Sequence, residues 1–282
     1  MGRLFAYIPN NITIQHQYNA VPETAAFQMH VHDHHELYYF LSGRGEFYVE
    51  GTRYLLEPGC MLLMQPGESH QVLISPGEPY ERITVHFFDR MIDHVTPHKE
   101  LLPILNGRPM GVGSFYPADQ LNQDMIRNCF QELQRLLDSG LYQEPHQLHM
   151  VLFSYLLPIF WDLQHYYFQE GKNAKLPEDD PINTIVTYIN GHLAEDISVE
   201  QLSKQFFISK STLNQKFKKV TGTSVWNFIL TKRLVHARIQ ILNGSRVHMA
   251  AQENGFHDYS SFYRRYVEKF GVSPTQSRSQ GQ

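Results

Sequence analysis

The chain has 282 residues, 42% of them hydrophobic, with 24 Lys and Arg against 28 Asp and Glu. It exceeds the usual size of one domain, so we expect two or three domains. Its two cysteines, Cys60 and Cys129, have no metal-binding spacing, which argues against a disulfide framework or a thiolate zinc site. Neither a signal-peptide core nor a run of about 18 apolar residues occurs, so we expect a cytoplasmic protein with no membrane partner.

Charge is divided unevenly along the chain. Residues 1–181 hold 11 Lys and Arg against 22 Asp and Glu, a net charge of −11, whereas residues 182–282 hold 13 against 6, a net charge of +7. A basic final third joined to an acidic front is typical of a phosphate-binding module attached to a partner domain that does not bind phosphate. An ordinary solvated charged face would give the same count.

Short apolar or alternating runs separated by turn residues extend from Phe27 to Phe88, among them "ELYYFL", "EFYV", "TRYLL" and "CMLLMQ". Runs of four to seven residues at this spacing predict an antiparallel sandwich or a small barrel. Residues 1–117 are therefore assigned to one β domain.

After Pro117 the apolar residues follow a helical period. One helix is predicted from Ala118 to about Leu137, and a second, kinked at Pro158, from about Pro145 to Gln169. Apolar helices after a barrel either cover it or pair with a second subunit, and we expect residues 118–170 to do both, giving a homodimer. The polar residues 171–181 are predicted to form a linker.

Two helix-turn-helix units are predicted in residues 182–282. Ser198 and Gln201 begin the first unit with a capping box, and Ser209 caps its second helix, "KSTLNQKFKKV". In the second unit the "NGF" turn separates two helices, and Asp258 caps the later one. An apolar helix over residues 224–242 joins the units; at about 1.5 Å per residue it is roughly 28 Å long, comparable to the ~34 Å between major grooves on one side of a duplex.

The final hundred residues resemble the AraC-type DNA-binding domain of bacterial transcription regulators. The resemblance rests on "ISVEQLSKQ", "SKSTLNQKFKKVTG", "VHMAAQENGF", "DYSSFYRRYVEKFGVSP" and the linking helix. It implies double-stranded promoter DNA as the partner, with base contacts from Ser211, Asn214, Gln215, Ser260 and Arg264. The aromatic residue usual after the closing "SP" is absent, so a less anchored C-terminus is expected.

Phosphate contacts are predicted from the basic side chains that flank these residues, because a lysine meets a phosphate as a point charge. They are Lys210, Lys218, Lys219 and Arg265.

The stretch "MHVHDHHELYYFLSG" at residues 29–43 contains His30, His32 and Glu36 at the spacing of the first cupin signature. On a strand, residues i and i+2 share a face, so the two histidines are predicted to point together into the barrel, while His34 and His35 are off-register and expected to be exposed. "PGESH" resembles a shortened second cupin signature that would supply His70.

Three uses of this cluster remain open: effector contacts, a catalytic metal, or strand pairing alone. Three imidazoles and a carboxylate could hold a divalent ion, but "PGESH" lacks one residue of the signature, and the AraC-type family often has a cupin-like sensor without metal. We assign no metal and no cofactor. The resemblance implies a small-molecule effector, with a sugar favoured, and the predicted effector contacts are His30, His32, Glu36, Tyr38 and His70.

The predicted fold class is α+β: a cupin-like antiparallel β-barrel, following helices, and an all-α domain of two helix-turn-helix units. The predicted function is an effector-controlled, sequence-specific transcription regulator without enzyme activity. A metal-dependent cupin enzyme with a DNA-binding module and a ligand-independent dimeric regulator are the alternatives.

Overall fold

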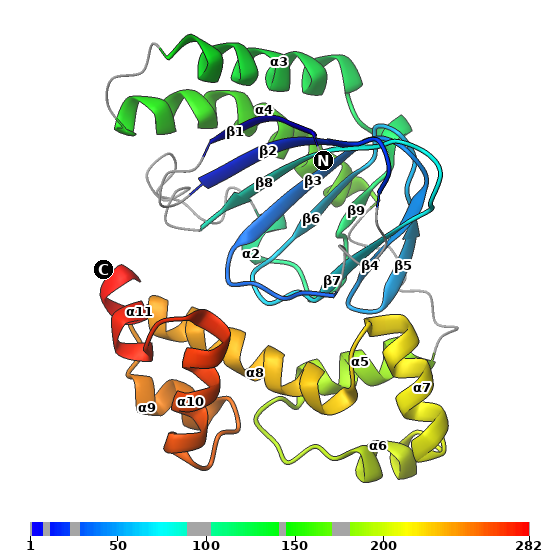
Figure 1. Ribbon diagram of the computed structural model, residues 1–282, viewed down its shortest axis with the longest axis vertical. Helices are drawn as coiled ribbons and strands as arrows, with labels where there is room; N and C mark the ends of the chain where they lie inside the picture. The colour runs from blue at the N-terminus through cyan, green and yellow to red at the C-terminus, as the bar shows by residue number, and fades with distance from the viewer. Residues whose placement is uncertain are drawn as a thin grey trace.

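The computed structural model describes residues 2–7, 12–22, 29–88, 103–140, 145–170 and 181–281. A β domain carries two long helices on one side, and a C-terminal helical domain lies against its other end (Figure 1). The strands are β1 (Gly2–Tyr7), β2 (Ile12–Asn19), β3 (His35–Ser42), β4 (Gly45–Val49), β5 (Thr52–Leu55), β6 (Met61–Met64), β7 (His70–Ile74), β8 (Tyr80–Phe87) and β9 (Phe115–Tyr116). The helices are α2 (Pro103–Asn106), the 3-10 turn η3 (Ala118–Gln120), α3 (Gln123–Ser139), α4 (Pro145–Gln169), α5 (Pro181–Gly191), α6 (Val199–Gln205), α7 (Lys210–Thr221), α8 (Val225–Leu242), α9 (Val247–Glu253), α10 (Tyr259–Phe270) and α11 (Pro274–Gly281).

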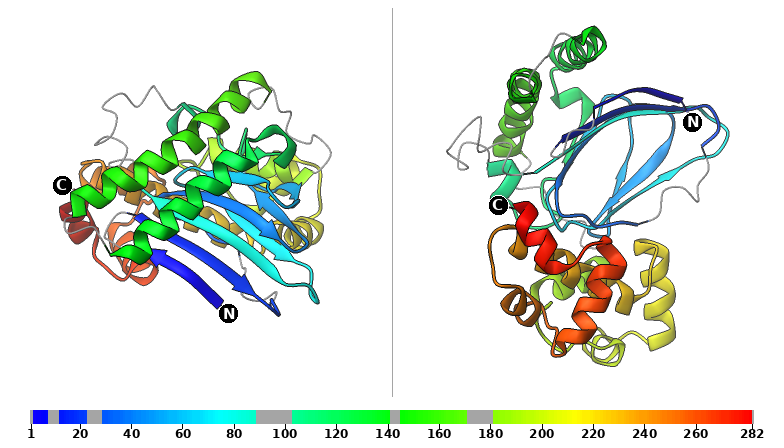
Figure 2. Two further views of the ribbon diagram at one scale, coloured as in Figure 1. Left: turned by 90° about the horizontal axis from the view of Figure 1, so that it is seen from above. Right: turned by 60° about the vertical axis from the view of Figure 1, so that its left-hand side comes forward.

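The strands form two antiparallel sheets that curve around one core (Figures 1 and 2). One sheet has the order β1-β2-β8-β3-β6-β9 and the other β5-β4-β7. Successive side chains of a strand point to opposite faces, so β3 contributes to two cores. Tyr38 and Phe40 pack between the sheets, whereas Leu37 and Tyr39 pack under the helices.

Helices α3 and α4 cover the outer face of the larger sheet (Figure 2). The first begins later than predicted, because η3 precedes it and Asn122 caps it by accepting a hydrogen bond from the Met125 amide. The second has the predicted bounds and contains Pro158. Both helices therefore cover the barrel, which is one of the two roles expected for them; the other is pairing with a second subunit.

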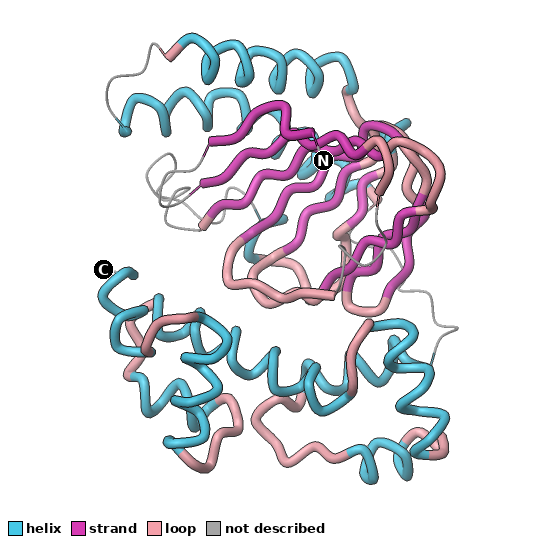
Figure 3. Tube along the Cα trace, in the orientation of Figure 1, coloured by secondary structure: helices cyan, strands magenta, loops and turns pink. Residues whose placement is uncertain are grey.

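In the described residues, the C-terminal domain consists of helices joined by loops (Figure 3). Two apolar clusters form around the two halves of α8: one with α5, α6 and α7, the other with α9 and α10. The predicted caps Ser198, Ser209 and Asp258 all accept hydrogen bonds from helix amides. No element was predicted for the segment that forms α5, whose isoleucines complete the first cluster.

The expectation of a less anchored C-terminus is wrong. Helix α11 packs against α8, and Ser277 is completely buried where an aromatic residue was expected. Of the predicted linker, residues 171–180 lie outside the described part of the chain. None of the described helices is long and apolar enough to cross a membrane.

Candidate functional site

Helices α7 and α10 each bury an apolar stripe and expose a polar one. Leu213 and Phe217 of α7 and Phe262 and Tyr266 of α10 are fully buried. On the opposite faces, every predicted DNA-contacting side chain is exposed: Lys210, Ser211, Asn214, Gln215, Lys218, Lys219, Ser260, Arg264 and Arg265. The structure thus places these nine residues on the solvent faces of the two predicted reading helices.

Two of the exposed cations already have partners. The ammonium group of Lys210 lies 3.2 Å from Glu200, and the guanidinium group of Arg265 lies 3.2 Å from Glu268. Within the described residues, the side chains of Asn214, Gln215 and Arg264 form no hydrogen bond or ion pair. These three side chains can reach a ligand without breaking an internal contact.

The turns of the two helix-turn-helix units have the same backbone conformation, but different residue types occupy the left-handed position. Ile208 N–H donates to Ser203 O, and Phe256 N–H donates to Ala251 O, so each preceding residue is left-handed. In the second unit this residue is Gly255, whose Cβ would lie 2.8 Å from the Arg233 guanidinium carbon. In the first it is Phe207, with φ of +54° and a 95% exposed side chain.

Four side chains converge at the mouth of the barrel. The Nε2 atoms of His32 and His70 lie 3.1 and 3.0 Å from Glu36 Oε2, and that of His30 lies 3.9 Å away. Their potential metal-ligating atoms all lie within 4.8 Å of one another. His86 of β8 adds a fourth imidazole, 3.3 Å from the same carboxylate oxygen.

The far sides of two imidazoles are held by main-chain carbonyls. His32 Nδ1 donates to His34 O at 2.8 Å, and His70 Nδ1 donates to Glu68 O at 3.0 Å. A carbonyl oxygen can only accept, so Nδ1 carries the proton in both rings. Both Nε2 atoms therefore point into the cluster with their orientation fixed.

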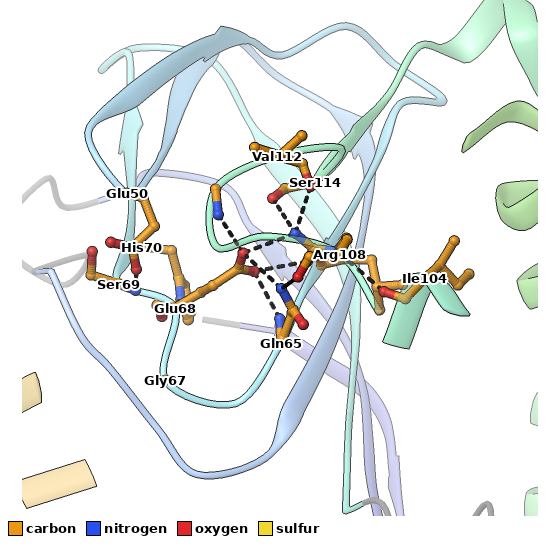
Figure 4. A network of polar contacts seen from close by, with 12 residues as sticks. Glu50, Gln65, Gly67, Glu68, Ser69, His70, Ile104, Arg108, Val112 and Ser114 are labelled. Atoms are coloured by element: carbon orange, nitrogen blue, oxygen red, sulfur yellow. Dashed lines mark hydrogen bonds and ion pairs between the residues drawn. The ribbon is translucent and has the colours of Figure 1, made fainter. Parts of the chain in front are cut away.

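Glu68, which anchors His70, belongs to a buried ion pair with Arg108 (Figure 4). Two Arg108 nitrogens each donate to a Glu68 oxygen at 2.8 Å, and the Gln65 and Gly111 amides also donate to this carboxylate. Both charged side chains are fully buried, and every carboxylate oxygen is hydrogen-bonded. The loop that precedes His70, the first residue of β7, is thereby fixed to the segment that carries Arg108.

Burial and charge act in opposite senses on the cluster. Burial lowers the pKa of His32 well below its ordinary value and also lowers that of His70, so both imidazoles favour the neutral form. Burial alone would raise the pKa of Glu36, but the surrounding histidines, His86 first, outweigh it and hold that pKa well below its ordinary value. The result is an anionic carboxylate ringed by imidazoles.

The C-terminal domain is docked against the loops that carry this cluster. Lys232 of α8 is fully buried, forms an ion pair with Glu50, and donates to Gly67 O at 2.7 Å. The second Glu50 oxygen accepts from the Asn190 side chain of α5 at 2.6 Å, and the first also accepts from the Ser69 amide. We call Glu50, Gly67, Ser69, Asn190 and Lys232 the interdomain clamp.

A second ion pair lies beside the cluster. The Arg238 guanidinium of α8 lies 2.6 Å from Asp33, which also contacts His34 at 3.2 Å. Burial alone would raise the pKa of Asp33, but His34 and Arg238 together lower it to about 2. On the same helix, burial and then Lys232 lower the pKa of His236 to about 4. The Asp33–Arg238 pair therefore joins the histidine-rich loop directly to the C-terminal domain.

Both halves of the chain match known family models. A model of the AraC-like ligand-binding domain matches residues 18–153, and one of a helix-turn-helix domain matches residues 202–280. The chain belongs to the AraC-type transcription regulators.

Similar proteins in this family span most of the chain. The uncharacterised HTH-type transcriptional regulator YdiP of Escherichia coli is 25% identical over 260 residues, covering 89% of this chain and 80% of YdiP. The HTH-type transcriptional activator RhaS of Escherichia fergusonii is 24% identical over 259 residues, covering 90% and 88%. Among solved structures, ToxT from Vibrio cholerae covers 96% of this chain and 98% of its own at 11% identity, with a TM-score of 0.39. The two matched domains, together with YdiP and RhaS, identify the chain as a transcription regulator and not an enzyme.

Two expectations about the histidine-rich stretch of this AraC-type chain are wrong. His30 and His32 do not lie on a regular strand; His30 forms an isolated bridge with His70, and β3 begins only at His35. His35 is completely buried, because the outer face of β3 lies under the helices and its ring stacks on Phe87. The shortened "PGESH" nevertheless brings His70 into the cluster.

Tyr38 is separated from the other four predicted effector contacts. It is only 2% exposed, and its hydroxyl group hydrogen-bonds to Tyr80 at 2.6 Å within the apolar core. The interior beside the cluster is filled by aromatic side chains. A narrow cleft lies instead between the domains, lined by Ser69 and His70 from the barrel and by Val220 and Thr221 from α7.

Several residues of this site were not found from the sequence. His86 lies in the alternating run "ERITVHFF", where its position on the same strand face as Thr84 was the available signal. Glu50, Lys232 and Asp33 gave no such signal, because an isolated charge in a sequence does not reveal its partner.

Proposed function

We propose that this AraC-type regulator binds promoter DNA through α7 and α10, under the control of a small polar effector bound at the mouth of the barrel. The observation that carries the proposal is the interdomain clamp. Lys232 lies on α8, around which both helix-turn-helix units pack, and its acceptors lie on loops next to His70. A ligand that binds one arrangement of these loops better than another therefore shifts the orientation of the DNA-binding domain.

Sequence recognition is assigned to the two exposed polar stripes. Helix α8 has 18 residues and is about 27 Å long, so the two units it joins can face successive major grooves, ~34 Å apart. Asn214, Gln215 and Arg264 are proposed to contact base edges together with Ser211 and Ser260. Lys210, Lys218, Lys219 and Arg265 are proposed to contact phosphates.

Variants of exposed residues test this assignment without affecting the core. Gln215→Ala and Arg264→Ala should each weaken binding to a selected DNA site about 10-fold or more, and binding to random duplex much less. Lys218→Ala should weaken both similarly and flatten the salt dependence. Arg135→Ala, an exposed cation of α3, is the control and should change neither; equal losses for Gln215→Ala and Lys218→Ala on both DNAs would refute the assignment.

The effector is proposed to be a small hydroxyl-rich molecule, with a sugar favoured, because Tyr48, Ser69, His70 and Gln71 offer hydrogen-bonding groups around the cleft. Tyr38 would act from behind the site by packing. A panel of sugars screened by thermal shift should contain one that raises the melting temperature and changes DNA affinity in the same concentration range. A stabilising sugar that leaves DNA affinity unchanged would exclude it as the effector.

A homodimer is proposed to form through α4. Its exposed face carries Met150, Trp161 and Phe168, which are 70%, 66% and 50% exposed. Ser154 and Pro158 lie on the same face, which has no charged residue at its centre, whereas the exposed face of α3 is rich in charge. Such an apolar stripe is typical of a surface that a partner covers.

Trp161→Glu tests the dimer. If α4 forms the interface, analytical ultracentrifugation of this variant should show a monomer at concentrations where the unaltered chain is dimeric. Arg135→Glu on α3 is the matched control and should leave the dimer intact. A Trp161→Glu variant that remains dimeric would exclude this face.

A further inference from the structure

An exposed tryptophan lies on the helix that links the two helix-turn-helix units. Trp226 is the second residue of α8 and is 59% exposed. Val225 and Phe228, beside it on the helix, are buried in the apolar cluster of the first unit. The Trp226 ring is not part of that cluster, so its apolar faces are available to a partner.

The ring of Trp226 lies on the side of α8 that faces away from the barrel. Two side chains of the same helix, Lys232 and Arg238, bind the barrel domain. They follow Trp226 by six and twelve residues, and at about 100° per residue this places each of them about 120° from it, in opposite directions around the helix axis. Trp226 therefore stays accessible while the two domains are docked.

Trp226 also lies beside cations that are proposed to contact DNA phosphates. The guanidinium carbon of Arg265, on α10, is 5.6 Å from the centre of the Trp226 ring, within the range of a cation–π contact. Lys218 and Lys219 lie in the last turn of α7, which ends just before α8 begins. Because α7 and α10 pack at opposite ends of α8 (Figure 1), the ring lies between the phosphate-contacting side chains of both units.

We propose that Trp226 packs on the sugar–phosphate backbone of DNA at the minor groove between the two major grooves that α7 and α10 enter. This minor groove lies midway between those major grooves, so its walls face a side chain placed between the two units. An indole ring offers an apolar face to a deoxyribose and an Nε1–H donor to a phosphate oxygen. The contact, which rests on the proposed DNA binding by α7 and α10, adds affinity without reading sequence, because sugars and phosphates are the same at every base pair.

Fluorescence of the full chain tests this contact directly, because the chain has only two tryptophans, Trp161 and Trp226. In the Trp161→Phe variant, a duplex selected for binding from a random DNA pool should shift the emission of Trp226. The same duplex should remove most of the quenching of Trp226 by acrylamide. Trp226→Phe, which keeps only Trp161 on α4, is the control and should show neither change.

DNA affinity gives a second measurement. Trp226→Ala should weaken binding to the selected duplex and to random duplex alike, by about 10-fold, with the salt dependence unchanged because the indole ring carries no charge. Trp226→Phe keeps an aromatic face and should recover part of that loss. Leu55→Ala, which removes a 60% exposed apolar side chain from β5, is the matched control and should leave DNA affinity unchanged.

The outcomes separate the Trp226 contact from the proposed function. Specific DNA binding that leaves Trp226 open to acrylamide overturns the contact, and so does a Trp226→Ala variant with unchanged DNA affinity. A loss confined to the selected duplex would show that the ring reads bases, and would overturn its assignment to the backbone. Protection of Trp226 that depends on protein concentration without DNA would assign the ring to a second copy of the chain instead. Absence of specific DNA binding by the unaltered chain would refute the proposed function itself.

Discussion

Replacing Lys232 by methionine should weaken the docking of the DNA-binding domain on the barrel. Methionine retains the aliphatic packing of the lysine stem, so the variant chiefly removes the charge. Glu50, whose side chain is 4% exposed, would then remain buried without its cation. Removing one partner of a buried ion pair typically costs 3–5 kcal/mol because the other charge stays desolvated.

The structure favours the lower end of that range. Glu50 would retain hydrogen bonds from Asn190 and the Ser69 amide, which stabilise part of its charge. We therefore expect a loss of about 3 kcal/mol, equivalent to about 150-fold in the docking equilibrium. The domains can avoid part of this cost by separating, because water then hydrates the Glu50 carboxylate.

Urea unfolding and small-angle X-ray scattering measure the two consequences. The Lys232→Met variant should unfold at lower urea concentration and have a larger radius of gyration. A double-mutant cycle with Glu50→Gln should give a coupling free energy of about 2–3 kcal/mol. Lys204→Met, which removes an exposed lysine paired with Glu200, is the control and should leave unfolding and scattering unchanged.

Two results would refute this reasoning. If the coupling free energy between positions 232 and 50 were near zero, the pair would not hold the domains together. If Lys232→Met were destabilised without any change in scattering, the lost free energy would lie within one domain rather than between the two.

Three further variants test other parts of the structure. His236→Gln should reduce the loss of stability between pH 6.5 and pH 4. In the unaltered chain the folded pKa of His236, about 4, lies below its unfolded value, so the unfolded state binds the proton first as the pH falls. The resulting loss in the free energy of unfolding reaches about 3 kcal/mol near pH 4. The free energy of unfolding is measured by urea titration at several pH values. If it falls equally steeply with pH in the variant and in the unaltered chain, this prediction is contradicted. Arg108→Met should cost about 3–5 kcal/mol in urea unfolding because Glu68 is left buried, and a loss below 1 kcal/mol would count against it. Phe207→Gly should raise the melting temperature, stabilising the chain by roughly 1 kcal/mol, because glycine accepts the positive φ without strain; a lower melting temperature would show that the exposed ring is needed.

Local rules were enough for the helix-turn-helix region. Ser198, Ser209 and Asp258 are polar caps followed by apolar residues at helical spacing, and each begins a helix at the predicted position. The start of α3 was missed because Asn122, rather than the residue after Pro117, satisfies its first amides. Neighbouring residues that can cap a helix differ little in free energy, and the apolar period does not show which of them begins the helix.

The histidine-rich stretch shows where periodicity fails. Alternation predicted that His30 and His32 share a strand face, but they meet through a bridge and a loop outside the regular sheet. The same rule separated His35 from these two histidines but did not predict that His35 is buried. Its ring stacks on Phe87, which is covered by Phe160 of α4, a helix far along the chain. Exposure is a property of the packed fold.

The sequence by itself determined the fold class, the two helix-turn-helix units, the polar faces of α7 and α10, and most of the histidine cluster. These features depend on residues close in the chain, where helical and strand periods and capping hydrogen bonds act. Only the tertiary structure decided that His86 joins the cluster, that Tyr38 belongs to the core, and that Lys232 meets Glu50 across 182 positions. The pairing of buried charges follows from how the two domains dock, and no local pattern encodes it.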